Sequence, residues 1–124
     1  MSATEWSELV NLPYCYVTTT GRRTGQPHRI EIWFGAHPDG GRIYLLSGGG
    51  DRSDWFRNLR AEPRIRLRIG DREWGTTARI VDDPEEDALA RRLLATKYQG
   101  WREGEPLSDW ARTALPVAIE VPGA

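Results

Sequence analysis

The strictest constraint on the fold is a run of alternating residues in the middle of the chain. Residues 64–69 read Arg-Ile-Arg-Leu-Arg-Ile, with an apolar residue at every second position. A Gly70-Asp71 turn follows, and residues 73–81 alternate again. Period-two alternation is typical of a half-buried strand, and a short glycine-bearing turn between two such runs predicts an antiparallel hairpin. The chain should therefore contain an antiparallel sheet with one buried face.

The rest of the chain predicts more strands and a few helices. Strands are expected at residues 14–20, 29–36, 42–47 and 116–121, and helices at residues 4–12, from Asp51 or Ser53 to 61, and at 82–98. A polar loop with tryptophans should join the last helix to the last strand. Because βαβ alternation is missing, about six mainly antiparallel strands with two or three short helices predict an α+β fold built round a small barrel. We expect one domain over residues 1–124.

Charge and composition narrow the classes of partner. With 17 basic and 18 acidic residues the chain has no overall field that would attract nucleic acid. The arginines at 64, 66 and 68 could follow a nucleic-acid backbone, but nearby acidic residues favour a solvated strand face, so we expect no nucleic-acid partner. No apolar run is long enough for a membrane span and the N-terminus lacks a signal-peptide pattern, which predicts a cytoplasmic protein. One cysteine and two histidines predict neither a disulfide nor a metal site.

Two glycine-bearing segments carry the strongest functional signal. Residues 20–29 read Thr-Gly-Arg-Arg-Thr-Gly-Gln-Pro-His-Arg, and residues 47–52 read Ser-Gly-Gly-Gly-Asp-Arg just before a predicted helix. Glycines leave backbone N–H groups uncovered, arginines add positive charge, and a helix N-terminus favours anions. A hairpin turn alone would explain the first segment, whereas three consecutive glycines exceed what a strand-to-helix loop requires. Together the segments predict a pocket for a phosphate.

These segments resemble the deazaflavin-dependent nitroreductase family. The resemblance rests on residues 18–27, 46–51 and 55–65, the last reading Trp-Phe-Arg-Asn-Leu-Arg-Ala-Glu-Pro-Arg-Ile, and it covers roughly residues 14–81. It implies a split β-barrel related to flavin-binding pyridoxamine phosphate oxidases. It also implies that coenzyme F420, whose structure includes a phosphate and an acidic tail, is the cofactor. His28 and Gly48 depart from the family pattern, which often has arginine and lysine at these positions.

The resemblance also implies the roles of individual residues. Phosphate and tail contacts are expected from the two glycine-bearing segments, and ring contacts from the strand near residue 32 and from the helix after residue 53. The cofactor-binding residues expected in this way are Arg23, Thr24, Gly25, His28, Ile32, Trp33, Ser47, Gly48, Gly49, Gly50, Trp55 and Asn58. Tyr98 and Trp101 are expected on the substrate side, with Tyr98 as the candidate catalytic proton donor.

The function implied is hydride transfer from reduced coenzyme F420 to small activated acceptors such as quinones, enones or nitro compounds. The cofactor performs the redox chemistry, and the protein orients it and keeps water away. An FMN-binding reductase and a non-catalytic carrier of flavin, haem or tetrapyrrole are the alternatives of the same fold. Related flavin-binding barrels often dimerise, so a homodimer is one expected assembly.

Overall fold

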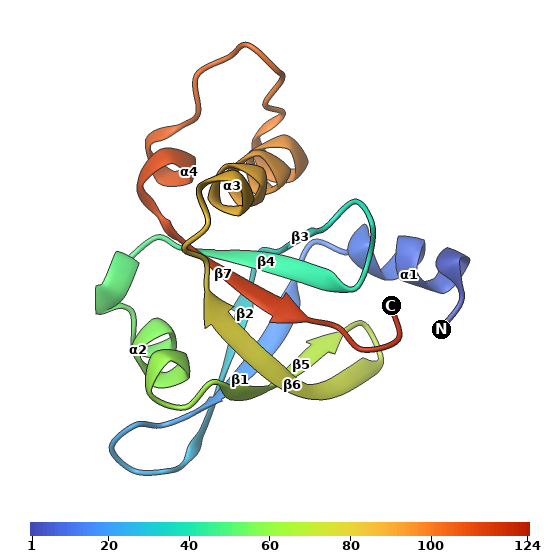
Figure 1. Cartoon of the computed structure of the whole chain (residues 1–124). Helices are drawn as coiled ribbons and strands as arrows, with labels where there is room; N and C mark the ends of the chain where they lie inside the picture. Colours follow the sequence, from blue (N-terminus) through green and yellow to red (C-terminus); the bar gives the residue numbers. More distant parts are fainter.

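Seven strands form one curled antiparallel sheet in the computed structural model, which describes residues 1–124 (Figure 1). The order across the sheet is β2-β1-β5-β6-β7-β4-β3. The strands are β1 (Cys15–Thr20), β2 (Pro27–Ile32), β3 (Gly35–Ala36), β4 (Arg42–Ser47), β5 (Arg64–Ile69), β6 (Arg72–Ile80) and β7 (Leu115–Glu120). The predicted hairpin is confirmed as β5–β6, which pairs from Arg64 opposite Thr77 to Ile69 opposite Arg72. The α+β class with an antiparallel sheet is confirmed as well.

The single strand predicted over residues 29–36 is wrong, because the chain bends at Trp33 and Phe34 and forms two strands. β2 pairs with β1 at one edge of the sheet, whereas β3 pairs with β4 at the other edge. The cause lies in the helix α3 (Pro84–Gln99): the Tyr98 hydroxyl accepts a 3.0 Å hydrogen bond from the Phe34 N–H, and Lys97 donates to the Phe34 carbonyl at 3.0 Å. With its backbone bonded to a helix, Phe34 cannot continue the strand, and the sheet has seven strands instead of about six.

Four α-helices and one short 3-10 turn flank the sheet. They are α1 (Ala3–Val10), η1 (Gly50–Arg52), α2 (Asp54–Ala61), α3 (Pro84–Gln99) and α4 (Asp109–Thr113). The three predicted helices are confirmed as α1, α2 and α3 with slightly different ends, and α4 lies inside the segment predicted as a loop. Ser108 caps α4 by accepting from the Ala111 N–H at 3.1 Å. Even α3, the longest helix at 16 residues, is too short and too polar to span a bilayer.

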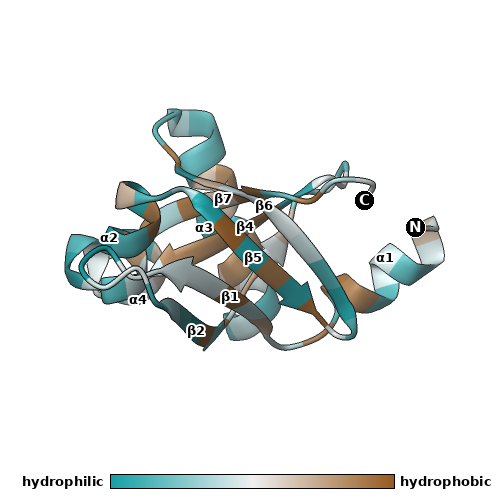
Figure 2. Ribbon diagram, turned by 90° about the horizontal axis from the view of Figure 1, so that it is seen from below, coloured by the Kyte–Doolittle hydropathy of each residue, from teal (hydrophilic) through white to brown (hydrophobic).

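The buried face of the sheet follows from the alternation seen in the sequence. Along β5, Ile65, Leu67 and Ile69 are buried while the arginines between them face solvent, a pattern visible as alternating bands in Figure 2. The apolar side chains pack with those of β1, β4 and β7 and with Phe56 and Leu59 of α2. α3 packs over β3 and β4 and closes a second, smaller core. Burial of this apolar surface is the main force that holds the curled sheet together.

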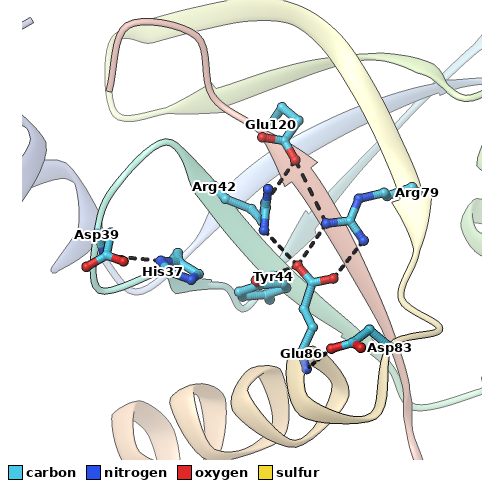
Figure 3. A network of polar contacts seen from close by, with 8 residues as sticks. All are labelled: His37, Asp39, Arg42, Tyr44, Arg79, Asp83, Glu86 and Glu120. Atoms are coloured by element: carbon cyan, nitrogen blue, oxygen red, sulfur yellow. Dashed lines mark hydrogen bonds and ion pairs between the residues drawn. The ribbon is translucent and has the colours of Figure 1, made fainter.

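The N-terminal turn of α3 is fixed to the sheet by a charged network centred on Glu86 (Figure 3). Its carboxylate accepts hydrogen bonds from Arg79 at 2.7 and 2.8 Å, from Arg42 at 2.8 Å and from the Tyr44 hydroxyl at 2.7 Å. These donors lower the pKa of Glu86 to about 2, with Arg79 as the largest cause. The network lies at the Arg42 end of β4, away from the glycine-bearing loop that follows Ser47, and we assign it a structural role.

Candidate functional site

The first glycine-bearing segment forms one wall of a hollow of about 400 Å³, which we call the anion hollow. The opposite wall is the start of α2. The hollow is lined by Gly21, Arg22, Arg23, Thr24, His28, Arg29, Ile30, Asp54, Trp55 and Asn58. Of the predicted cofactor residues, Arg23, Thr24, His28, Trp55 and Asn58 therefore come together here. Three arginines against one aspartate give this hollow a net positive lining, as a phosphate site requires.

Two adjacent arginines in the anion hollow have different roles. Arg22 is clamped, because its guanidinium donates to Asn58 Oδ1 at 2.8 Å and to Asp54 at 3.1 Å, and its backbone N–H also donates to Asn58. Arg23 is exposed and has no hydrogen bond or ion pair within the protein. Arg22 therefore holds the loop on α2, while the charge of Arg23 is available to a ligand.

Asn58 is buried, and both the oxygen and the nitrogen of its side-chain amide form hydrogen bonds within the protein. Besides accepting from Arg22, it donates to the Thr19 hydroxyl at 3.3 Å. This arrangement favours a positioning role for Asn58 over direct contact with a ligand. His28 packs on Gly21, where a Cβ atom would lie 2.7 Å from its ring nitrogen, so a side chain at Gly21 would displace the ring from its present position.

The second glycine-bearing segment forms a loop that is held by hydrogen bonds of the Ser47 side chain. Ser47 is fully buried, and its hydroxyl donates to the Gly50 carbonyl at 2.7 Å and lies 3.0 Å from the Ser53 hydroxyl. Gly50 has φ +61°, which favours glycine, and a side chain at Gly49 would strike Ser53. A Cβ atom at Gly48 would lie 3.3 Å from the Trp110 ring. Ser47 thus sets the loop shape, and the glycines let the loop approach Ser53 and Trp110 closely.

A second, more apolar hollow of about 500 Å³ lies at the far end of β2, and we call it the aromatic hollow. It is lined by Tyr14, Glu31, Ile32, Trp33, Leu46, Gln99 and Trp110. Trp33 stacks on Tyr98 with ring centroids 4.3 Å apart and planes within 3°, and it meets Trp110 edge to face at 5.4 Å. Such a flat apolar surface suits a planar ring system. The predicted residues Ile32 and Trp33 lie here.

Tyr98 supports the aromatic hollow from behind. Its hydroxyl lies 3.0 Å from both the N–H and the carbonyl of Phe34 and 2.8 Å from the Pro13 carbonyl. Burial raises the pKa of Tyr98 to about 12. A hydroxyl whose pKa is raised releases its proton less readily, and the backbone contacts keep this hydroxyl in place. The geometry therefore favours a positioning role for Tyr98, in which its ring supports Trp33.

Trp101 and Trp110 occupy different places in the segment after α3. Trp101, the predicted substrate-side residue, donates its ring N–H to the Glu105 carbonyl at 2.8 Å and lines neither hollow. Trp110, which was not among the residues predicted from the sequence, lines the aromatic hollow from α4. The Ser108-Asp109 pair before it is a helix-start signal that could have indicated α4.

Strand β2 connects the two hollows. His28 and Ile30 line the anion hollow, while Ile32 and Trp33 line the aromatic hollow. At about 3.3 Å per residue, the four steps from His28 to Ile32, the last residue of β2, span about 13 Å. An elongated ligand with an anionic part and a flat ring would therefore find both of its ends matched along one edge strand.

Comparison with solved structures identifies the fold. The chain superposes on the F420-H2 dependent reductase FDR-A with a TM-score of 0.66 and 24% identity, over 87% of this chain and 94% of that one. It also superposes on a domain-swapped dimer with a TM-score of 0.68 and 22% identity, over 96% of this chain and 100% of that one. The predicted split barrel is confirmed by these likenesses.

Comparison of sequences identifies the family. The chain is 32% identical over 115 residues to the F420H2-dependent quinone reductase Rv1261c of Mycobacterium tuberculosis, covering 88% of this chain and 72% of the relative. The model of the F420H2-dependent quinone reductase family matches residues 2–122, almost the whole chain. This chain therefore belongs to the F420H2-dependent quinone reductase family.

Proposed function

We propose that this protein reduces quinones with reduced coenzyme F420. The observation that carries the proposal is the course of β2, which joins a basic hollow to an aromatic one. Family membership and the name of the Mycobacterium tuberculosis relative agree with it. The predicted acceptor class narrows from quinones, enones or nitro compounds to quinones as the first substrates to test.

The residues present fit this coenzyme. Arg23 offers an unpaired guanidinium and His28 a ring without hydrogen-bond partners, which suits the phosphate. Ile32, Trp33 and Trp110 offer an apolar surface for the ring system. We infer that Thr24 and Gly25 shape the turn under the phosphate, and that Gly48, Gly49 and Gly50 let the second loop approach the coenzyme. Trp55 lines the anion hollow from α2.

The chemistry divides between the cofactor and the protein. Bound reduced coenzyme F420 would supply the hydride, and one proton from solvent completes the conversion of a quinone to a hydroquinone. The side chains bind the two reactants at one edge of the sheet, and Trp33, fixed by Tyr98 and Trp110, excludes water from the ring-binding surface. This division needs no acid or base from the protein.

The oligomeric state is the second part of the proposal. One solved structure of this fold is a domain-swapped dimer, and we propose that this protein is also able to form a homodimer. Light scattering coupled to gel filtration over a range of protein concentrations measures the mass directly. A monomer mass at every concentration would contradict this part of the proposal.

The experiment that tests the function is a paired titration followed by an assay. Oxidised coenzyme F420 and FMN are titrated separately while tryptophan fluorescence is recorded, and menadione reduction by reduced F420 is then followed by absorbance. We expect saturable binding of F420, weaker binding of FMN, and turnover that depends on the protein. Binding of FMN alone would move the protein to the flavin-binding branch, and binding without turnover would indicate a carrier.

A further inference from the structure

Lys97 is the only lysine in the chain, and its ammonium group lies in a partly buried place between α3, α1 and the bend at Phe34. The Nζ atom donates to the Val10 carbonyl at 2.9 Å and to the Phe34 carbonyl at 3.0 Å. It also lies 3.7 Å from the centroid of the Phe34 ring. These contacts fix the position of one positive charge inside the protein.

No carboxylate neutralises the charge of Lys97. The titratable groups that face it are the Cys15 thiol of β1 and the Tyr98 hydroxyl of its own helix, while α1 and the bend at Phe34 present carbonyl oxygens. Burial raises the pKa of both Cys15 and Tyr98 to about 12, so both are uncharged at pH 7. Burial lowers the pKa of Lys97 to about 8, so the ammonium keeps its charge at pH 7 without a counter-ion.

Stability does not account for a charged lysine in this place. The folded pKa of about 8 lies below the ordinary value of 10.5, so below pH 8 the charge disfavours the folded state relative to the unfolded one. The two hydrogen bonds to backbone carbonyls therefore compensate for burial only in part. This balance indicates a role for the charge outside folding.

The charge lies close to the aromatic hollow. The Nζ atom is 5.0 Å from the centroid of the Tyr98 ring, which stacks on the Trp33 ring at 4.3 Å, so it lies no more than the sum, 9.3 Å, from the Trp33 centroid. Through aromatic rings a charge acts more strongly than it does through water. The only charged residue in the lining of the hollow is Glu31, which is exposed and accepts a hydrogen bond from Tyr16. Lys97 thus supplies a positive potential that the lining itself lacks.

Quinone reduction creates negative charge at this surface. When hydride is transferred, the C–H bond of the donor breaks, an O–H bond forms on the quinone, and the product is a hydroquinone monoanion. A proton from solvent then gives the neutral hydroquinone. A cation that is already fixed in position lowers the energy of the monoanion more than that of the neutral quinone, and so favours the transfer.

We propose that Lys97 is a specificity-determining residue, whose positive charge makes the aromatic hollow favour acceptors that are, or become, anionic. This inference rests on the proposed function and names the charge of the acceptor ring as the property that the hollow selects. Lys97 acts from behind Tyr98 and Trp33 through its electric field and does not touch the acceptor.

The test compares two naphthoquinones in protein saturated with oxidised coenzyme F420, where no hydride is transferred. Lawsone, a hydroxynaphthoquinone, is an anion at pH 7, and menadione is neutral. Calorimetric titration measures both Kd values for the wild type, Lys97→Met and Lys97→Arg. Arg92→Met removes an exposed cation from the same helix and is the control for net charge.

The expected pattern depends on the charge of the ring. Lys97→Met should weaken lawsone binding about three- to tenfold, the scale for unit charges about 10 Å apart with partial screening by water, and leave menadione binding nearly unchanged. Lys97→Arg should retain most of the preference, and Arg92→Met all of it. With reduced F420, Lys97→Met should also slow single-turnover hydride transfer to menadione several-fold.

The wild type provides a second test that needs no variant. Between pH 7 and pH 9.5 the Lys97 ammonium loses its proton, while lawsone remains an anion and menadione remains neutral. The preference for lawsone should therefore fall toward that of Lys97→Met. Over the same range the unfolding free energy of the wild type should rise relative to Lys97→Met, because deprotonation removes a charge that the fold disfavours.

Two results would overturn the role of the charge and leave the proposed function intact. One is an equal loss of affinity for both quinones in Lys97→Met, which a purely structural role would produce. The other is a wild-type preference that does not change with pH. Failure of oxidised F420 to bind the wild type would overturn the proposed function and this inference together.

Discussion

The guanidinium of Arg22 donates a 2.8 Å hydrogen bond to the side-chain oxygen of Asn58, 36 residues further along the chain. This contact joins the β1–β2 turn to α2 and so forms the two walls of the anion hollow. Since Asn58 also donates to Thr19, one buried amide holds three elements together. The positions of the charged groups in the hollow therefore depend on a residue that need not touch the ligand.

Replacing Asn58 should destabilise the protein as well as weaken cofactor binding. Asn58→Ala leaves the Arg22 backbone N–H and guanidinium without their acceptor, and loss of a partner for a buried polar group costs about 1–3 kcal/mol. Urea unfolding would measure the loss of free energy of unfolding. Asn11→Ala, which removes a hydrogen bond on the exposed end of α1, is the control. An unchanged unfolding midpoint would contradict the clamp.

Arg23→Ala should weaken cofactor binding without destabilising the protein. Because Arg23 has no partner within the protein, its removal should leave the unfolding free energy unchanged while it weakens F420 binding by ~1–3 kcal/mol, the scale of a charged hydrogen bond. Fluorescence titration measures the affinity. The matched control is Arg102→Ala, another exposed arginine whose guanidinium has no partner, outside both hollows. Equal affinity in Arg23→Ala and wild type would count against the anion hollow as the phosphate site.

The alternation of apolar and polar residues made most of the sheet predictable from the sequence. The positions of the side chains in the candidate site depend instead on contacts between residues far apart in the chain. Alternation over residues 64–81 identified the β5–β6 hairpin, because each half-buried strand shows its own period. The break at Phe34 could not be predicted, since it depends on hydrogen bonds from residues 63 and 64 positions away. Similarly, glycines revealed both loops, but the partners of Asn58 and Ser47 became clear only in three dimensions.

The sequence also did not show which of Trp101 and Trp110 lines the aromatic hollow. Both tryptophans lie after α3, and nothing in their local sequence says which one turns toward β2. The five-residue α4 is too short to produce a visible apolar period, so its orientation is set by packing of Trp110 against Trp33 and Gly48.

Protonation of Glu86 at low pH should lower the free energy of unfolding. Its folded pKa of about 2 lies below the ordinary value of 4.5, so the stabilisation is complete above pH 4.5 and is lost as the pH falls toward 2. The shift corresponds to at most about 3 kcal/mol. In urea unfolding between pH 7 and pH 3, Glu86→Gln should be less stable at pH 7 and show a flatter acid dependence. Glu85→Gln, with no partner, should retain the wild-type slope.

The two tryptophans should differ in their effect on quinone reduction. Trp110→Ala removes the edge-to-face contact with Trp33 and opens the aromatic hollow, so the KM for menadione should rise several-fold. Trp101→Ala serves as the matched control and should leave this KM nearly unchanged, because Trp101 lies outside the hollow. Steady-state kinetics at saturating reduced F420 measures both values. A larger effect from Trp101→Ala would restore Trp101 as the substrate-side residue.

Tyr98→Phe decides between positioning and proton donation. The variant keeps the ring that stacks on Trp33 but loses the contacts of the hydroxyl to Phe34 and Pro13. If Tyr98 only positions Trp33, the unfolding free energy should fall while kcat for quinone reduction stays within a few-fold of wild type. If the hydroxyl donates a proton in the rate-limiting step, kcat should fall about 10²-fold or more and the solvent isotope effect should change. Because burial raises the pKa of Tyr98 to about 12, which opposes proton release, we expect the first outcome.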